Sequence, residues 1–415
     1  MDSAWPSTAA GLRGLETLWQ HINWWMECAA ERGEQTSMPE AQATRLDSPR
    51  RSQAMCGAWV MSVELLSTET ALPDTTLSFE DTQRLLPLLT GGEAEVPRWA
   101  PTAARTRINR RHLIMPVAEL ARRSGPRARS LEYETTVCEL GKIVATKALA
   151  ASGVPPLEIR AILTVSCTGY MLPSVDAHLI PALGLTTTVR RIPITELGCS
   201  AGVAALSLAG QLVPVLGGPA LVVSVELCSL CLQTEAIEPS DVLGNLLFAD
   251  AAAAAVVGEA SEPHGPALLA SRSVLWPDST RQLGMKLSDT GLRLVLSPEV
   301  PDSVQRHLPA TLESFLASQQ LTLDDIRWWV VHPGGPKILE AVGECLRLPE
   351  GALAPSWSVW QQCGNVSSAT VFFIARAIRA MSAPPRGSLG LMMAFGPGLS
   401  CELLLLRADG WIAGA

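Results

Sequence analysis

Cys199, His332 and Asn365 are the residues of this 415-residue chain whose types and surroundings best suit chemistry. Cys199 lies between Gly198 and Gly202, immediately before an apolar run with a helical pattern. That position would put the sulfur at a helix N-terminus, where unpaired N–H groups and the helix dipole favour a thiolate. The competing interpretation is a buried structural cysteine, because cysteine is among the most buried residue types.

His332 and Asn365 stand at two further points where a regular element begins or ends. His332 follows the apolar run 328–331 and precedes Gly334 and Gly335, which predicts a strand that ends in an imidazole. Proteins of the α/β class bind their ligands at the carboxyl ends of such strands. Asn365 opens a helical pattern, where its amide could donate to a developing oxyanion or could simply cap the helix.

A cysteine, a histidine and an asparagine in this order suit an enzyme that joins acyl thioesters. Cys199 would accept a starter acyl group, and the imidazolium of His332 would stabilise its thiolate. His332 and Asn365 would then hold the thioester oxygen of a malonyl unit while decarboxylation leaves an enolate. The carbanion would attack the acyl-cysteine, and the scheme requires no metal and no redox cofactor.

Short β-branched runs alternate with alanine-rich helical patterns along most of the chain, which indicates an α/β architecture. We expect strands at 58–66, 159–165, 220–225 and 328–331, and helices at 135–151, 201–216 and 369–381. A weak repeat supports a duplicated fold: Cys199 comes 33 residues after Ser166, and Asn365 comes 33 residues after His332. In each case a strand and polar turn are followed by a small-residue turn that opens a helix.

The chain divides by pattern into three parts. Residues 55–265 form a half that carries the nucleophile Cys199, and residues 266–415 form a half that carries His332 and Asn365. Residues 1–54 are expected to be a helical or disordered extension. Their apolar positions at 12–28 have helical spacing, which fits either a docking helix or a dispensable tail.

Composition excludes several other classes. Hydrophobic residues make up 47% and charged residues 17%, which indicates a large interior or a buried dimer face. The net charge of −8 argues against a nucleic-acid partner, because such proteins need a basic face. We find no uninterrupted apolar run of about 18 residues, so no membrane span is expected. The ten cysteines show neither a four-ligand zinc spacing nor a compact disulfide framework, which favours a reduced, cytoplasmic protein.

The motifs around the three polar residues resemble the type III polyketide synthases, the family of the chalcone and stilbene synthases and their bacterial members. The resemblance runs from about residue 58 to the C-terminus. It rests on segments 196–202 (Glu-Leu-Gly-Cys-Ser-Ala-Gly), 247–253, 331–336 (Val-His-Pro-Gly-Gly-Pro), 364–369 and 394–398. It implies a five-layer αβαβα thiolase-like fold with two pseudo-symmetric halves, assembled as a homodimer.

The resemblance also implies roles for further positions. Phe248 matches the gatekeeper between the coenzyme A tunnel and the cavity, and Leu294 stands where plant members have a second gatekeeper phenylalanine. Met285 replaces a glycine of the cavity wall and would reduce or reshape the cavity. The other positions that match the cavity are Cys167, Thr168, Cys228, Cys231, Ser367, Phe395, Gly396 and Pro397.

Two more sets of residues follow from the same resemblance. Leu172 matches the residue that crosses the dimer interface into the cavity of the partner. Arg107, Arg110 and Arg111 resemble the basic patch that receives the phosphates of coenzyme A. A solvated basic surface is the plainer interpretation of that patch.

The implied activity is loading of a starter acyl-CoA, iterative condensation with malonyl-CoA, and cyclisation to a pyrone, resorcinol or polyhydroxy-aromatic product. No acyl carrier protein and no cofactor beyond the coenzyme A thioesters would take part. The nearest alternative is a ketoacyl-carrier-protein synthase III, which performs one condensation. A hydroxymethylglutaryl-CoA synthase, a papain-like cysteine hydrolase and a catalytically silent thiolase-fold scaffold are the others.

Overall fold

The computed structural model describes residues 62–123, 125–235, 237–260, 262–381 and 383–410. The expectations for residues 1–54 and for the start of the first strand therefore fall outside the described residues. Within the described ranges, nine strands form one mixed sheet in the order β11-β12-β13-β8-β1-β7-β6-β4-β5. Their bounds are β1 Ser62–Ala71, β4 Ala161–Val165, β5 Arg190–Ile194, β6 Ala220–Leu227, β7 Asp250–Ala260, β8 Pro266–Leu275, β11 Ile326–Val331, β12 Leu389–Gly396 and β13 Ser400–Ala408.

The sheet consists of two halves that meet at one narrow seam. Strands β1 and β8 pair only through Glu64 and Ala267, whereas β1 pairs with β7 along most of its length. On one side of the seam β4 runs parallel to β5 and β6, and on the other β11 runs parallel to β12. The expected division after residue 265 falls between β7 and β8.

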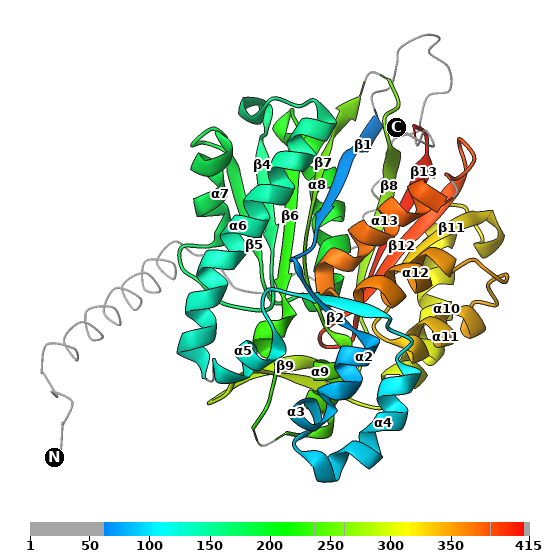
Figure 1. Ribbon diagram of the computed structural model, residues 1–415. Helices are drawn as coiled ribbons and strands as arrows, with labels where there is room; N and C mark the ends of the chain where they lie inside the picture. The colour runs from blue at the N-terminus through cyan, green and yellow to red at the C-terminus, as the bar shows by residue number, and fades with distance from the viewer. Residues whose placement is uncertain (1–61, 124, 236, 261, 382, 411–415) are drawn as a thin grey trace, which may run out of the picture. The chain divides into compact units, whose positions relative to one another are not determined.

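Helices cover both halves and also separate them (Figure 1). The central helices α8 (Ala201–Leu216) and α13 (Thr370–Met381) contact strands of both halves. Helix α6 (Pro126–Ser152) and α7 (Val175–Leu183) cover the outer face of one half. Helices α10 (Val300–Ser318) and α11 (Pro336–Cys345) cover the outer face of the other. The layers thus follow the expected order αβαβα.

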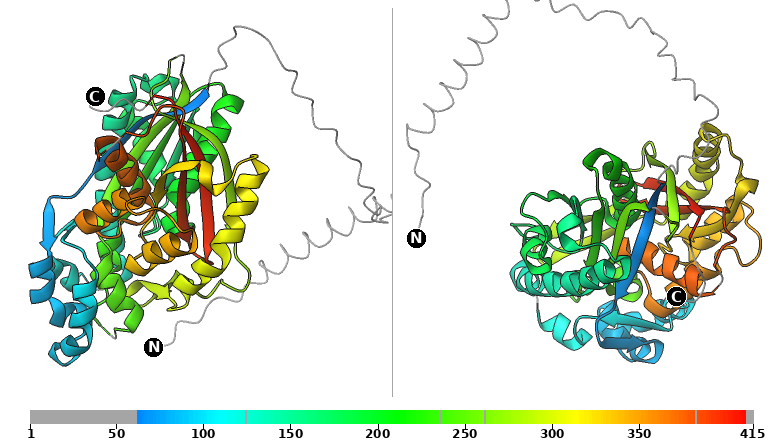
Figure 2. Two further views of the ribbon diagram at one scale, coloured as in Figure 1. Left: turned by 90° about the vertical axis from the view of Figure 1, so that its right-hand side faces the viewer. Right: turned by 90° about the horizontal axis from the view of Figure 1, so that it is seen from above.

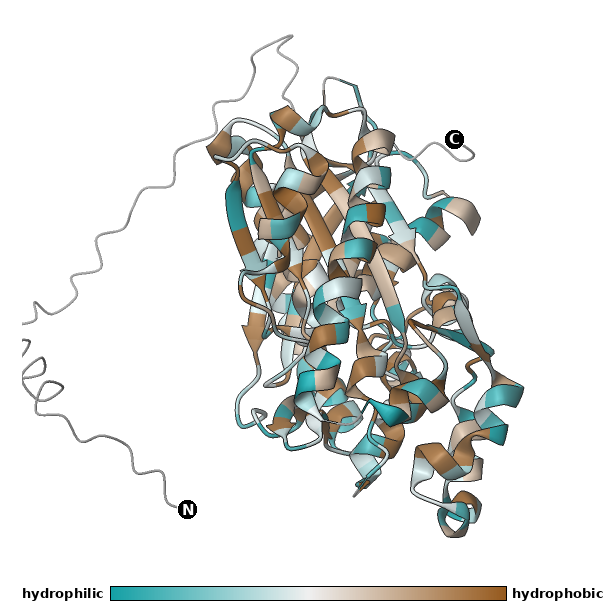
Figure 3. Cartoon of the chain, turned by 60° about the vertical axis from the view of Figure 1, so that its left-hand side comes forward, coloured by the Kyte–Doolittle hydropathy of each residue, from teal (hydrophilic) through white to brown (hydrophobic). Residues whose placement is uncertain are grey.

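Residues along β12 show how the sheet is buried on both faces. Leu391 and Met393 belong to the core under the outer helices, whereas Met392 and Ala394 belong to the central core around α8 and α13. Because side chains of a strand alternate between faces, a strand covered on both sides must be apolar throughout. The predicted strands and helices of these halves are present, but α6 begins at Pro126 rather than at residue 135, and β1 continues to Ala71 rather than ending at residue 66. The strands are mostly brown in Figure 3, whereas the long outer helix in front of them carries hydrophilic positions on its outer side.

Helix α8 is apolar because it lies in the central core, in contact with strands of both halves. By length and composition the stretch Gly198–Leu216 would be able to cross a membrane, but half of it is buried inside the described fold. Buried helices of large soluble cores have this all-round apolar pattern.

Two glycines allow close approaches around the turn that carries Cys199. A Cβ atom on Gly202 would lie 2.2 Å from the carbonyl oxygen of Ser368, which precedes α13. Gly198 has φ +53, and a Cβ there would lie 2.7 Å from Pro397. The turns that carry Cys199 and Asn365 are thus in direct contact, which the 33-residue repeat did not require.

Smaller elements gather beyond one end of the large sheet, as Figures 1 and 2 show. Helix α9 and the hairpin β9–β10 close this end; α9 precedes β7 in the first half, and the hairpin follows β8 in the second half. The elements are β2 Thr75–Ser78, α2 Phe79–Arg84, α3 Leu86–Thr90, α4 Val96–Arg105, β3 Arg110–Leu113, α5 Val117–Arg122, α9 Pro239–Leu247, β9 Leu283–Ser288, β10 Gly291–Leu296 and α12 Ala354–Cys363.

Candidate active site

Cys199 occupies the short 3-10 turn Gly198–Ser200 that leads directly into α8. Its Sγ lies 3.6 Å from the Oγ of Ser367, the first residue of the matching turn before α13. Ser367 has φ 50, a left-handed backbone that a non-glycine residue adopts only at a cost of order 1 kcal/mol. That conformation holds the Ser367 hydroxyl beside the sulfur of Cys199.

Asn365 is fixed by hydrogen bonds of both its backbone and its side chain. Its N–H donates to the carbonyl oxygen of Leu247 at 2.8 Å, and its own carbonyl accepts from the N–H of Ala249 at 2.9 Å. Its Oδ1 accepts from the N–H of Ser367 at 2.8 Å. The amide nitrogen is therefore the part of Asn365 that is left to donate toward the thiol of Cys199 or a bound thioester.

His332 directly follows β11, as the sequence predicts. Its N–H donates to the carbonyl of Met393 on the neighbouring strand β12, and its side chain is only 1% exposed. In the part of the chain that the structure describes, neither ring nitrogen has a hydrogen-bond partner. The end of β12 packs on the nucleophile turn, since a Cβ on Gly396 would meet Ser200 at 2.2 Å. The structure thus places all three predicted residues at one end of the sheet.

Burial opposes charge on both the cysteine and the histidine. It raises the pKa of the Cys199 thiol to about 12, although hydrogen bonds with Ser367 and Asn365 act in the opposite direction. It lowers the pKa of His332 to about 3. An isolated buried charge is costly, so a thiolate can form here only together with its counter-ion. A proton acceptor for Cys199 would avoid an uncompensated charge, and His332 is the expected one.

The expected role of His332 as proton acceptor for Cys199 predicts the reactivity of a His332→Gln variant. Without a proton acceptor, the buried thiol must ionise alone, so we expect its alkylation by iodoacetamide to slow at least about tenfold at pH 7. The pH midpoint of the reaction should move upward from that of the unaltered protein. The readout is alkylation of Cys199, followed by peptide mass spectrometry over roughly pH 5 to 10. An unchanged pH profile would show that His332 does not take the proton.

A mostly apolar cavity extends from Cys199 and has about 890 Å³ of space between atoms, counting its open mouth. Several of the residues that the family resemblance assigned to a cavity lie along its wall. These are Cys167, Thr168, Cys228, Cys231, Phe248, Met285, Leu294, Ser367 and Pro397.

Two predicted cavity residues lie elsewhere. Phe395 is buried in the core beneath the outer helices, where its ring lies 5.8 Å from that of Trp276. Gly396 packs against the carbonyl of Leu197 and against Ser200 rather than along the cavity. Both residues belong to β12, whereas Pro397, in the loop after the strand, lines the cavity.

The three arginines that the resemblance assigned to coenzyme A differ in their exposure to solvent. Arg107 is exposed at 56%, lies over the ring of Trp357 at 5.0 Å and forms an ion pair with Glu340. Arg110 is exposed as well. Arg111 departs from the expectation, because it is buried and its Nη1 donates to backbone carbonyls inside the protein. Side chains of a strand alternate, so adjacent arginines of β3 point to opposite faces.

A buried carboxylate beside the cavity was missed by sequence reasoning. Glu226, at the end of β6, accepts from the N–H of Cys167 at 3.1 Å and from the hydroxyl of Thr168 at 3.2 Å. It also accepts from Ser368 and from the thiol of Cys167. Burial raises the pKa of Glu226, while these hydrogen bonds lower it. The available signal was a glutamate inside an otherwise apolar strand, since such a residue needs buried partners.

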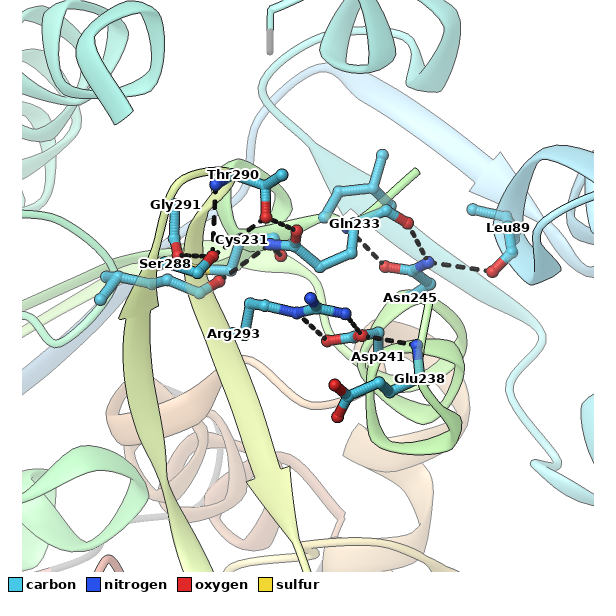
Figure 4. A network of polar contacts seen from close by, with 12 residues as sticks. Leu89, Cys231, Gln233, Glu238, Asp241, Asn245, Ser288, Thr290, Gly291 and Arg293 are labelled. Carbon is cyan, nitrogen blue, oxygen red and sulfur yellow. Dashed lines mark hydrogen bonds and ion pairs between the residues drawn. The ribbon is translucent and has the colours of Figure 1, made fainter. Parts of the chain in front are cut away.

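A second network, also missed, anchors the wall that carries Met285 and Leu294 (Figure 4). Met285 and Leu294 face each other across the β9–β10 hairpin. Arg293 of that hairpin forms a partly buried ion pair with Asp241 of α9. Gln233 donates to the carbonyl of Leu292 at 3.1 Å and accepts from Thr290 at 2.7 Å. These contacts hold the hairpin against α9, so the cavity wall is fixed by polar contacts behind it.

The anchored wall makes the side chain of Met285 a determinant of cavity size. Met285→Gly should open the cavity and shift products toward longer chains, or admit larger starters, without slowing acylation of Cys199 by a small starter more than about threefold. The product spectrum, measured by mass spectrometry, is the readout. The matched control is Leu287→Gly on the same strand, because Leu287 is 75% exposed. Identical spectra for both variants would contradict the assignment.

The fold and the site together define a thiolase-fold condensing enzyme, and comparisons with known proteins give its family. The family models of chalcone and stilbene synthases match this chain twice, with the N-terminal domain at residues 119–263 and the C-terminal domain at residues 267–409. A 1,3,6,8-tetrahydroxynaphthalene synthase of Streptomyces peucetius is 35% identical, over 82% of this chain and 92% of the relative. A phloroglucinol synthase of Pseudomonas fluorescens is 32% identical, over 77% and 93%.

A solved structure agrees with these relatives. The tetrahydroxynaphthalene synthase of Streptomyces coelicolor, described as a bacterial type III polyketide synthase, has a TM-score of 0.79 and 29% identity, covering 83% of this chain and 99% of that chain. The chain therefore belongs to the chalcone and stilbene synthase family, as a type III polyketide synthase. It is an acyltransferase-class condensing enzyme, and its family distinguishes it from the other condensing enzymes considered above.

Proposed function

We propose that Cys199 accepts the starter acyl group and that His332 and Asn365 bind the thioester oxygen of the malonyl unit. The observation that carries this proposal is the meeting of a nucleophile turn and an asparagine turn at the end of one mostly apolar cavity. Loading transfers the acyl group from coenzyme A to Sγ, and the thiol of coenzyme A leaves with the proton held by His332. Decarboxylation then gives an enolate whose oxygen faces the two donors.

The surroundings of His332 and Asn365 support their proposed role as donors to the thioester oxygen. His332 and Asn365 are almost completely buried, so donors at these positions act in a water-poor site where they need no reorganisation. The free ring nitrogens of His332 and the fixed orientation of the Asn365 amide suit one oxygen bound by both. The same two donors would serve the decarboxylation and the condensation steps.

Chain growth and cyclisation are proposed to take place in the cavity beyond Phe248. Its wall is mostly apolar, with the thiols and hydroxyls of Cys167, Thr168, Cys231 and Ser367 among the polar groups. These groups would orient the carbonyl oxygens of a poly-β-keto chain. The named relatives make a naphthalene-tetrol and phloroglucinol, so we propose a polyhydroxy-aromatic product, with a resorcinol or a pyrone as the other possible ring closures.

Coenzyme A thioesters are the proposed substrates, without an acyl carrier protein or a separate cofactor. Arg107 and Arg110 are exposed arginines of the segment that leads into the cavity wall, and they would meet the phosphates. Arg111 is left out of this set because it is buried. The described cysteines are all free, which supports a reducing, cytoplasmic setting; recovery of the protein outside the cytoplasm in cell fractionation would contradict it.

We also propose that the enzyme is a homodimer in which Leu172 reaches the partner. Leu172 is 82% exposed and Tyr170 is 73% exposed, on a loop that follows β4. Large apolar side chains gathered on one exposed loop are typical of an interaction surface. A solution mass of 44.2 kDa, that of one chain, would contradict the dimer.

The function is tested by incubating the protein with malonyl-CoA, alone and with acyl-CoA starters, and weighing both products and intact protein. We expect a starter-sized mass on Cys199, carbon dioxide release and a cyclised product. Cys199→Ala should lose the adduct and at least about a thousandfold of product formation. Cys138→Ala, which changes a half-buried cysteine of the outer helix α6, should lose neither. Folded protein that forms no adduct and releases no carbon dioxide would support the silent scaffold instead.

A further inference from the structure

We infer that Arg111 is a positioning residue that holds the backbone segment to which Asn365 is bonded. The inference rests on the role proposed above for Asn365 in malonyl decarboxylation. It gives the buried arginine of β3 a function other than contact with coenzyme A.

Arg111 fixes the end of helix α9. Its side chain is 3% exposed, and its Nη1 donates to the carbonyl oxygens of Asn245 at 2.7 Å and of Phe248 at 2.8 Å. These carbonyls lie in the last turn and at the C-cap of α9. Carbonyls at a helix end have no intrahelical partner, and a cation there also interacts favourably with the helix dipole. The guanidinium therefore sets where the helix stops and where the next segment starts.

The segment that starts there is the one that holds Asn365. The N–H of Asn365 donates to Leu247 and its carbonyl accepts from Ala249, at 2.8 and 2.9 Å. Phe248 lies between these two partners and forms a parallel bridge with Asn365. Residues 247–249 thus form a clamp on the backbone of Asn365, and Arg111 holds Phe248, the middle residue of that clamp. A shift of Phe248 would therefore move Asn365 as well.

The stem of Arg111 also touches the residue before Asn365. Gly364 has φ +68, and a Cβ there would lie 2.7 Å from the Leu247 carbonyl and 3.1 Å from the Cγ of Arg111. The absence of a side chain at Gly364 lets the arginine and the clamp pack directly on its backbone. Gly364 and Asn365 are therefore confined between Arg111 and residues 247–249.

The chain that leads to Arg111 is bonded to the helix that leads to Asn365. The N–H of Asn109 donates to the carbonyl of Gln361 at 2.8 Å, and Nε1 of Trp360 donates to the carbonyl of Thr106 at 2.6 Å. Gln361 and Trp360 belong to α12, which ends just before Gly364. Two independent sets of bonds thus join the β3 region to the Asn365 turn.

Electrostatics keep Arg111 charged in this position. Burial lowers the pKa of Arg111 to about 10, and the nearby carboxylate of Asp250 acts in the opposite direction. Asp250 is itself held by the N–H groups of Ile114 and Ser229 and by the Ser229 hydroxyl. At neutral pH the guanidinium remains a cation and a donor to both carbonyls.

The test separates the two chemical steps of the enzyme. In Arg111→Met, release of carbon dioxide from malonyl-CoA should fall between about tenfold and hundredfold, because the Asn365 donor is displaced. Acylation of Cys199 by a starter acyl-CoA should change less than about threefold, since it uses Cys199 and His332. The matched control is Arg306→Met on α10, an exposed arginine, for which both rates should stay unchanged.

A double-mutant cycle distinguishes positioning from general support. If Arg111 acts through Asn365, adding Arg111→Met to Asn365→Ala should reduce decarboxylation less than about twofold further. Arg111→Lys keeps a charge and a donor, so it should recover part of the lost rate, and it replaces Arg111→Met in the cycle should that variant not fold. Equal losses of acylation and decarboxylation, or fully multiplicative effects in the cycle, would overturn the inference alone. Full decarboxylation by Asn365→Ala would overturn the proposed role of Asn365 and the inference together.

Discussion

The proposed active site depends on a close contact between two turns that lie 168 positions apart, as the pairing of Cys199 with Ser367 shows. Gly202 allows this contact because only a hydrogen fits between α8 and the carbonyl of Ser368. Helices α8 and α13, which follow the two turns, form the central layer and contact strands of both halves. The packing that joins the halves is therefore the same packing that brings a cysteine beside an asparagine.

Burial gives this arrangement its chemical character. Burial opposes the charged forms of both Cys199 and His332, so a charge on either group is costly without a counter-ion. Asn365 and Ser367 are fixed by backbone hydrogen bonds before any substrate binds. Donors that are already oriented in a water-poor site stabilise a developing oxyanion without paying for their own reorganisation. The left-handed backbone at Ser367 is a local cost that the surrounding packing has to offset.

Much of the fold and the three central residues could be predicted from the sequence, because apolar runs, helix-opening turns and the order of the motifs are local signals. Cys199, His332 and Asn365 each lie at the end of an element whose pattern is visible in the chain. What escaped prediction depends on strand facing and on partners distant in sequence. Arg111 points inward while Arg110 is exposed, and Phe395 belongs to the outer core although Pro397, two residues later, lines the cavity.

Polar residues behind the cavity were missed for a related reason. The roles of these residues depend on partners in other elements. Glu226 accepts a hydrogen bond from Cys167, and Arg293 of the β9–β10 hairpin forms an ion pair with Asp241 of α9. No local pattern specifies those partners. A charged residue within an apolar strand was a visible sign of a buried network, but not of its members.

The most direct measurement of this account is malonyl-CoA decarboxylation by a Gly202→Ala variant that remains folded. Its added Cβ would meet a backbone carbonyl at 2.2 Å, so the two turns must move apart. Gly210→Ala on the same helix is the matched control, because its Cβ would meet only the flexible end of Leu268 at 3.0 Å. We predict a loss of at least about tenfold for Gly202→Ala and less than about twofold for Gly210→Ala. Equal rates in the two variants would contradict the claim that contact between the turns forms the site.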